Sequence, residues 1–188
     1  MSAAPKDANG VSNDLAHIGI LVVSDRARSG EYEDESGKAI SEFLNRAVRS
    51  SWTSIVKIVP NGVDSVATAL VEMSDGEGCD LILTTGGTGP PPRDLTPEGT
   101  RRVIERELAG FGELMRRVSL QQVPTAILSR QTAETRGHCL IVNLPGRPSS
   151  IELCLGAVFP AIPYCLDLIG ARKIEVNPDV YVSFRPGT

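Results

Sequence analysis

Aromatic side chains and an excess of positive charge are both lacking in this 188-residue sequence. Aromatic residues make up only 4% of it, which argues against the stacking platforms that bind single-stranded nucleic acid. The formal net charge of −4 argues against general nucleic-acid binding, because that function favours a basic face. We therefore expect no nucleic-acid partner.

Metal-binding and disulfide patterns are lacking as well. The two histidines, His17 and His138, do not have the spacing of zinc ligands. The four cysteines form no CxxC pair, and each lies in or beside an apolar run, so we expect buried, reduced thiols. These are Cys79, Cys139, Cys154 and Cys165. The N-terminus has no hydrophobic signal core and no apolar run approaches transmembrane length, which predicts a cytoplasmic protein with no membrane partner.

What the sequence does contain is a glycine-rich turn between an apolar strand and a helix. Gly86, Gly87 and Gly89 follow a strand that begins at Leu81. Glycine lets the backbone adopt positive φ and lets a ligand approach the main chain closely. Successive N–H groups in such a loop can form an anion-binding nest. The spacing matches neither a P-loop nor a dinucleotide-binding fingerprint, and a tight turn without a ligand is the alternative.

The exit of this loop resembles the start of a helix. Three prolines at 90–92 stiffen it, and residues 96–98 read Thr-Pro-Glu. We expect Thr96 to be the N-cap, Pro97 the first helical residue and Glu98 part of the first turn. A strand, a glycine-rich turn and a helix N-terminus together are the usual phosphate site of an α/β protein.

Apolar strands alternate with amphipathic helices along the chain. This pattern predicts a three-layer α/β/α sandwich with a mostly parallel sheet. We expect residues 1–14 to be a disordered leader and residues 15–188 to form a single α/β domain. Segment 124–130 is ambiguous between loop and strand, and residues 181–184 could add an edge strand or dock on a neighbouring subunit. The expected strands are 18–23, 54–59, one from Leu81 and 139–143; the expected helices are 36–48, 63–73, 97–108, 113–121, and one that Ser149 and Ser150 cap and that continues, kinked by Pro160 and Pro163, to Leu168.

Unusual loops follow three of the predicted strands, and in a parallel sheet such loops meet at one edge. They begin at Ser24-Asp25, at Gly86 and at Asn143. If the strands are adjacent, the loops form one pocket lined by backbone N–H groups, hydroxyls and the Asn143 amide. Arginines near that edge favour a polyphosphate ligand, although each could also be a solvated surface residue. These arginines are Arg26, Arg28, Arg93, Arg130 and Arg147.

Asp94 is the best catalytic candidate in these loops. They contain no Lys, Cys or His that could act as a covalent nucleophile. A carboxylate beside a phosphate nest most plausibly holds Mg²⁺, which bridges phosphate oxygens. The alternatives for Asp94 are a helix cap or a salt bridge with Arg93.

These residues carry a resemblance to a known family. Residues 84–89 (TTGGTG) with Arg93-Asp94 and residues 96–98 (TPE) resemble the signature of the molybdopterin-binding family, which acts in molybdenum cofactor synthesis. Residues 24–26 (SDR), 29–30 (SG), 110–113 (GFGE), 124–130 (PTAILSR) and 143–146 (NLPG) resemble its adenylyltransferase branch, the MogA-like proteins. The resemblance extends from about residue 18 to 186.

The resemblance implies a reaction and a set of residues. ATP and molybdopterin would give adenylyl-molybdopterin and pyrophosphate with Mg²⁺, which Asp94 would hold. Ser129 and Asn143 would hydrogen-bond the pterin or the nucleotide. The resemblance also implies a homotrimer and, as a partner, the molybdate-inserting enzyme of the same pathway. The other substrate-binding residues would be Ser24, Asp25, Thr85, Gly86, Gly87, Thr88, Gly89, Thr96, Pro97, Pro145 and Gly146.

One catalytic position departs from the family pattern. The family usually has an acidic residue after the proline that ends the second strand, but here Asn61 follows Pro60. Asn61 can offer a carbonyl oxygen to a metal but brings no charge, and Asp64 one turn later could substitute for the acid. Asn61 therefore also favours an alternative, a non-catalytic module that carries molybdopterin. A third hypothesis is a small-nucleotide phosphohydrolase on the same scaffold.

Overall fold

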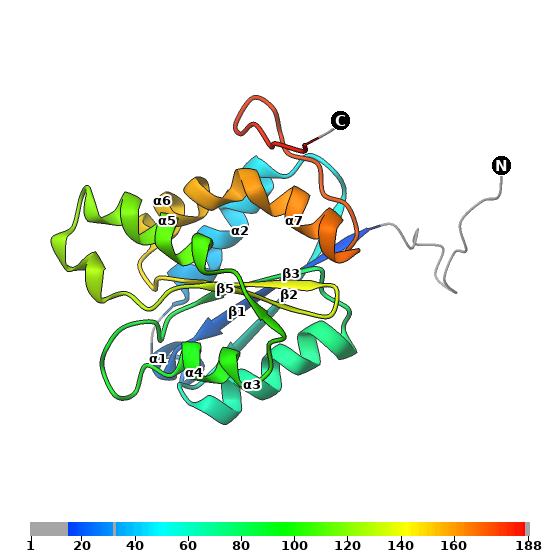
Figure 1. Ribbon diagram of the computed structural model, residues 1–188. Helices are drawn as coiled ribbons and strands as arrows, with labels where there is room; N and C mark the ends of the chain where they lie inside the picture. Colours follow the sequence, from blue (N-terminus) through cyan, green and yellow to red (C-terminus); the bar gives the residue numbers. More distant parts are fainter. Residues whose placement is uncertain (1–14, 32, 187–188) are drawn as a thin grey trace.

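The most apolar runs of the sequence form the central strands of one sheet in the computed structural model, which describes residues 15–31 and 33–186 (Figure 1). The strands β3 (Leu81–Thr85) and β6 (Cys139–Leu144) are buried throughout, and β1 (Ala16–Val23) is buried except at His17. Strand β2 (Trp52–Val59) is only half-buried and lies at an edge, as its weaker apolar pattern indicates. The predicted leader at 1–14 lies outside the described residues.

The sheet is mostly parallel, as the alternation of strands and helices predicts. Its strand order is β2-β1-β3-β6-β5-β4, and the first four strands are parallel. Strand β5 (Ala133–Arg136) pairs antiparallel with β6, and β4 (Arg106–Glu107) pairs antiparallel with β5 and completes the sheet. The sequence did not predict β4 and β5, because both are short and rich in charged residues.

Helices cover both faces of the sheet, which confirms the predicted three layers (Figure 1). One face packs on α2 (Glu35–Ala47), α5 (Ala109–Leu120), α6 (Pro148–Val158), η3 (Phe159–Ala161) and α7 (Ile162–Ile169). The other packs on α3 (Val63–Val71), its π-helical extension η1 (Glu72–Gly76) and α4 (Thr96–Arg101). The single turn α1 (Asp25–Arg28) follows β1 directly.

The predicted helix 97–108 is wrong in its second half. Helix α4 ends at Arg101, and the chain then joins the sheet: the Glu105 N–H donates to Thr135 O at 2.8 Å and the Leu108 N–H to Ala133 O at 2.7 Å. The glycines at 110 and 112 do not interrupt a helix but lie within α5. A Cβ on Gly112 would lie 2.5 Å from Gln131 O, so glycine allows α5 to pack closely on the chain beside it.

Two other segments also differ from their predictions. Residues 124–130 are neither strand nor irregular loop, because Pro124–Leu128 forms a short 3₁₀ helix, η2. Residues 181–184 form no edge strand, because Tyr181 turns inward and its ring packs 5.3 Å from Phe43 and 5.8 Å from Phe159 between ring centroids. Val182 and Phe184 stay exposed, so docking of this segment on a neighbouring subunit remains a prediction.

The continuous apolar segment 148–169, made of α6, η3 and α7, corrects the expectation that nothing approaches transmembrane length. By length and composition it could cross a membrane. Its apolar character has a different cause here, because Ile151, Leu155, Phe159, Ile162 and Leu166 are fully buried in the core against the sheet.

The cysteines are free thiols, as predicted. Cys79, Cys139 and Cys154 are buried and Cys165 is half-buried. Burial raises the pKa of Cys79 to about 12, so this thiol stays protonated and unreactive at neutral pH.

Candidate functional site

The ends of three adjacent strands lie together at one edge of the sheet. Of the three predicted loops, those after β3 and β6 line one cavity, whereas Ser24 and Asp25 after β1 do not line it. Val22 of β1 pairs with Thr85 of β3, and Thr85 pairs with Leu144 of β6. The Thr85 hydroxyl donates to Pro145 O at 2.9 Å, which ties the glycine-rich loop to the loop after β6. Gly86 has φ +93°, and a Cβ there would lie 2.4 Å from Val23 O, so only glycine fits between the strand ends.

Thr96 anchors the glycine-rich loop to α4, although not as the predicted N-cap. It is the first helical residue, and the cap position is Leu95, whose side chain accepts no capping bond. The Thr96 hydroxyl instead donates to Gly86 O at 2.8 Å, and its N–H donates to Gly87 O at 3.1 Å. Pro97 is therefore the second helical residue and not the first as predicted, whereas Glu98 lies in the first turn as predicted.

Gly87→Ala is expected to lower the free energy of unfolding by about 1–2 kcal/mol, because Gly87 has φ +63°. The added Cβ would also lie 2.4 Å from the Thr96 hydroxyl and 3.0 Å from Asn61 Oδ1. Urea unfolding measures the change. The matched control is Gly110→Ala in helix α5, where a Cβ meets nothing within 4 Å, and it should leave stability equal or raise it. Equal stabilities of the two variants would contradict the strained role of Gly87.

A cavity of about 610 Å³ opens over the loop. Eight of the predicted site residues line it, namely Gly86, Gly87, Thr88, Gly89, Asp94, Ser129, Pro145 and Gly146. The other predicted residues do not line it; these are Ser24, Asp25, Asn61, Thr85, Thr96, Pro97 and Asn143. The Oγ of Ser129 is buried and has no hydrogen-bond partner among the described residues, so it can still bond a ligand.

Sequence reasoning missed two parts of the lining. Residues 119–128, from the end of α5 through η2, form one wall, and of this stretch only the family motif that begins at Pro124 gave a signal in the sequence. Ser149 and Ser150 form another, at the start of α6. They do not cap α6 as predicted, since its cap position is Arg147 and Pro148 is the first helical residue. The position of α6 directly after β6 was the signal that could have placed them.

Asp94 is held at the mouth of the loop. Its Oδ2 accepts the Gly89 N–H at 3.1 Å, and its Oδ1 lies 3.9 Å from Arg93 Nε. The side chain is 21% exposed, so one oxygen can still reach a ligand. The predicted alternative of a salt bridge with Arg93 exists, but Arg93 is itself 78% exposed and is weakly held.

Arg130 holds the glycine-rich loop by hydrogen bonds to its backbone carbonyls. Its backbone N–H donates to Thr88 O at 2.9 Å and its Nε to Gly89 O at 3.0 Å. Its guanidinium also bonds the Asp94 carbonyl and the Glu98 carboxylate. Burial is the largest single influence on the pKa of Glu98 and acts to raise it. The hydrogen bond and charge of Arg130, a backbone hydrogen bond and the charge of Arg101 together hold that pKa below its ordinary value. Of the predicted arginines, Arg130 therefore uses its hydrogen bonds to hold the loop in place, whereas Arg147 lines the cavity.

Asn143 supports the site rather than reaching into it. It is fully buried, and its Oδ1 accepts the Thr84 hydroxyl at 2.8 Å while its Nδ2 donates to Thr100 Oγ1 at 3.1 Å. Thr100 in turn donates to Thr96 O at 2.8 Å. The amide thus connects β3, β6 and α4 under the glycine-rich loop.

The second catalytic candidate, Asn61, pairs with Asp25. Its backbone N–H and its Nδ2 donate to the two Asp25 carboxylate oxygens at 2.9 and 3.0 Å. Asp64 cannot replace the family's acid, because its side chain is 89% exposed and bonds Arg102 on the outside of α3. Ser24 caps α1 by accepting the Ala27 N–H at 3.2 Å.

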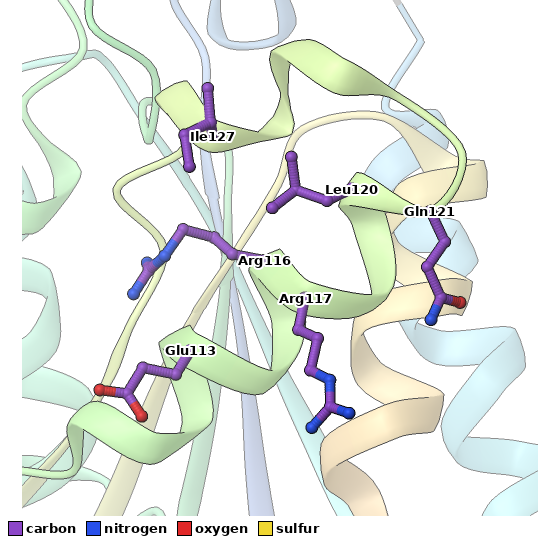
Figure 2. A pocket seen from close by; sticks show the side chains of 6 residues that line it. All are labelled: Glu113, Arg116, Arg117, Leu120, Gln121 and Ile127. Atoms are coloured by element: carbon purple, nitrogen blue, oxygen red, sulfur yellow. The ribbon is translucent and has the colours of Figure 1, made fainter.

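A second hollow, of about 540 Å³, lies on the outer side of α5 beside η2 (Figure 2). Arg116, Arg117, Leu120 and Ile127 are among its lining residues. Arg116 donates to Gln131 O at 2.7 Å and so belongs partly to the fold. None of the predicted site residues lines this hollow, so it is separate from the candidate site.

The fold and the site define an α/β protein with a cavity over a glycine-rich loop, at the carboxyl ends of adjacent parallel strands. Its sequence matches the family model described as "Probable molybdopterin binding domain" over residues 19–164. The chain belongs to this molybdopterin-binding family, and the resemblance drawn from the glycine-rich signature is confirmed.

Similar proteins share most of this chain. A molybdopterin adenylyltransferase of Helicobacter pylori (strain J99) is 54% identical over 170 residues, which cover 90% of this chain and 97% of that protein. A molybdopterin adenylyltransferase of Escherichia coli K12 is 42% identical over 181 residues, which cover 90% and 93%. Among solved structures, the crystal structure of the molybdopterin biosynthesis enzyme MoaB from Thermus thermophilus superposes with a TM-score of 0.76. Its sequence is 42% identical, and the match covers 85% of this chain and 100% of that one.

Proposed function

We propose that this chain is an enzyme of molybdenum cofactor synthesis that transfers AMP from ATP to molybdopterin and releases pyrophosphate. The observation that carries the proposal is the single cavity onto which the glycine-rich loop, Asp94 and the start of α6 all open. Its relatives in Helicobacter pylori and Escherichia coli carry the name of that activity. The cavity volume of about 610 Å³ is in the range of ligand sites, about 300–1,000 Å³.

In the proposed reaction a phosphate oxygen of molybdopterin attacks the α-phosphorus of ATP. The bond from that phosphorus to the bridging oxygen breaks, and pyrophosphate leaves. The protein needs to supply alignment and charge neutralisation and no covalent nucleophile. Backbone N–H groups of residues 86–89 would bind phosphate oxygens. Arg147, Ser149 and Ser150 at the start of α6 would bind others, and Ser129 would bond the pterin or the nucleotide.

The residues present fit a Mg²⁺ ion that is held mainly by substrate. Among the described residues, no three His, Cys, Asp or Glu side chains gather into a metal site. Mg²⁺ is commonly held by one or two carboxylates together with substrate phosphates and water, which suits Asp94 alone. The buried Asn61 Oδ1, which has no hydrogen-bond partner in the described chain, is a second oxygen of the right kind. When bound, the ion would neutralise phosphate charge.

The test is to mix the purified protein with molybdopterin, Mg-ATP and pyrophosphatase and to detect adenylyl-molybdopterin by mass spectrometry. Product at a rate that depends on the protein supports the transferase. Bound molybdopterin without product, and without dependence on ATP, would replace it with the carrier module. ATP hydrolysis that molybdopterin does not affect would replace it with a phosphohydrolase.

We further propose a cytoplasmic homotrimer that passes its product to the molybdate-inserting enzyme of the pathway. The free thiols suit a reducing compartment. Large apolar side chains that stay exposed on η2 and near the C-terminus supply surface for contact between copies: Ile127 is 65% exposed and Phe184 72%. Light scattering after size-exclusion chromatography should give three times the mass of 20.1 kDa, and a monomer at micromolar concentration would contradict the trimer.

A further inference from the structure

One carboxylate fixes the orientation of the Asn61 side chain. Asp25 Oδ1 accepts the Asn61 backbone N–H at 2.9 Å, and Asp25 Oδ2 accepts Asn61 Nδ2 at 3.0 Å. A carboxylate only accepts hydrogen bonds, so the NH₂ end of the amide must face Asp25. The amide oxygen must therefore point the other way.

That oxygen points toward the glycine-rich loop. A Cβ built on Gly87 would lie 3.0 Å from Asn61 Oδ1, so the two are in close contact. Asn61 Oδ1 is buried and accepts no hydrogen bond from the described residues. A buried acceptor without a partner is unfavourable, and a donor or cation at the loop would relieve this.

The negative charge of the Asp25 carboxylate lies next to the Asn61 amide. The hydrogen bonds from Asn61 are the main cause that holds the pKa of Asp25 below its ordinary value, and the charge of Arg93 adds to them. Arg93 also lies beside Asp94, so one cation acts on both carboxylates at the mouth of the loop. A carboxylate bonded to the NH₂ group polarises an amide and increases the negative charge on its oxygen.

We propose that Asp25 is a positioning residue for adenylyl transfer, which holds the Asn61 oxygen toward the glycine-rich loop and supplies the charge that Asn61 lacks. The oxygen then receives a cation or an N–H or O–H donor that arrives with the polyphosphate. This inference rests on the proposed function. It also gives Asp25 a role other than the predicted direct contact with substrate, because both of its carboxylate oxygens already accept hydrogen bonds from Asn61.

The test is a double-mutant cycle of Asp25→Asn and Asn61→Ala. Kinetics of the transfer give kcat and KM for each variant, and calorimetry without molybdopterin gives the Kd of Mg-ATP. Asp25→Asn is expected to lower kcat and to weaken Mg-ATP binding, each at least tenfold. Its melting temperature should stay close to that of the wild type, because Asp25 is exposed. In the Asn61→Ala background the same change should have almost no effect, since Asp25 acts through the amide. Asp64→Asn, which removes the same charge on the outside of α3, is the control and should be neutral.

Two results overturn the inference. One is Asp25→Asn with kcat and Kd within twofold of the wild type. The other is an equal loss whether residue 61 is Asn or Ala, because Asp25 would then act by another route. If the wild type makes no adenylyl-molybdopterin, the proposed transferase fails, and the cycle on Mg-ATP binding still decides the role of Asp25. A wild type that also does not bind Mg-ATP overturns both.

Discussion

An Asp94→Asn variant is expected to catalyse adenylyl transfer at least about a hundredfold more slowly than the wild type, which corresponds to about 2.7 kcal/mol of lost transition-state stabilisation. The reason is the loss of Asp94, the one carboxylate among the described residues that line the cavity beside the glycine-rich loop. The amide oxygen of Asn can still accept the Gly89 N–H that Asp94 Oδ2 accepts at 3.1 Å, so the loop should keep its shape.

Steady-state kinetics with varied Mg²⁺ concentration test this expectation. We expect kcat to fall and the Mg²⁺ concentration for half-maximal rate to rise, because the variant brings no charge to the cation. Asp64→Asn again serves as the control with the same change of charge. Turnover of Asp94→Asn near that of the control would remove Asp94 from the role of metal ligand.

The second large effect concerns a buried carboxylic acid in β5. Glu134 is fully buried, and neither of its carboxyl oxygens has a hydrogen-bond partner among the described residues. Burial, with a smaller contribution from the charge of Glu107, raises the pKa of Glu134 from 4.5 to about 8. Glu107 lies directly opposite on β4, which explains its influence. At pH 7 the folded protein therefore holds Glu134 mainly as the neutral acid.

This raised pKa makes stability depend on pH with a definite sign. Between pH 4.5 and about 8 the folded state keeps a proton that the unfolded state has lost. The free energy of unfolding therefore falls as pH rises through this window, by about 1.4 kcal/mol per pH unit and on the order of 4 kcal/mol between pH 5 and pH 8. The stability that protonated Glu134 contributes is fully present below the pKa of the unfolded state, 4.5. It is lost once the pH has risen to the pKa of the folded state, about 8.

Glu134→Gln isolates this contribution, because Gln resembles the neutral acid and does not titrate. Urea unfolding of wild type and variant at pH 5, 6.5 and 8 should give curves that lie close together at pH 5 and separate at pH 8, where the variant is the more stable. Other titrating groups are common to both proteins and cancel in the difference. Glu107→Gln should reduce the slope of the wild type only in part. Parallel curves for wild type and Glu134→Gln would show that Glu134 is ionised in the folded protein.

The sequence predicts best those elements whose own residues carry a clear signal, such as a continuous apolar run. Strands β3 and β6 are apolar because both faces are covered, and the glycine-rich loop is visible because Gly86 and Gly87 adopt a positive φ that other residues rarely adopt. Strand β5, by contrast, reads Ala-Glu-Thr-Arg and becomes a strand only because β6 offers it an edge. The end of α4 at Arg101 likewise depends on the pairing of Glu105 and Leu108 with β5.

The same limit applies to the site. Asp94 and the glycines follow β3 directly, so their place at the sheet edge could be predicted from the chain order. Asn143 also belongs to a strand that ends there, but its direction into a hydrogen-bond network with Thr84 and Thr100 depends on the packing of α4. The wall formed by η2 comes from a distant segment, and only the tertiary fold brings it over the loop.

The parallel sheet also determines when the site can exist during folding. Strand β1 pairs with β3, as in Ile18 with Leu81, and β3 pairs with β6, as in Leu81 with Leu140. Both pairings join residues far apart in the chain, and such contacts form late because loop closure costs entropy before the contact stabilises anything. During synthesis the cavity therefore cannot form until β6 and the start of α6 have left the ribosome, and a chain interrupted before residue 150 carries the whole glycine-rich signature without a binding site.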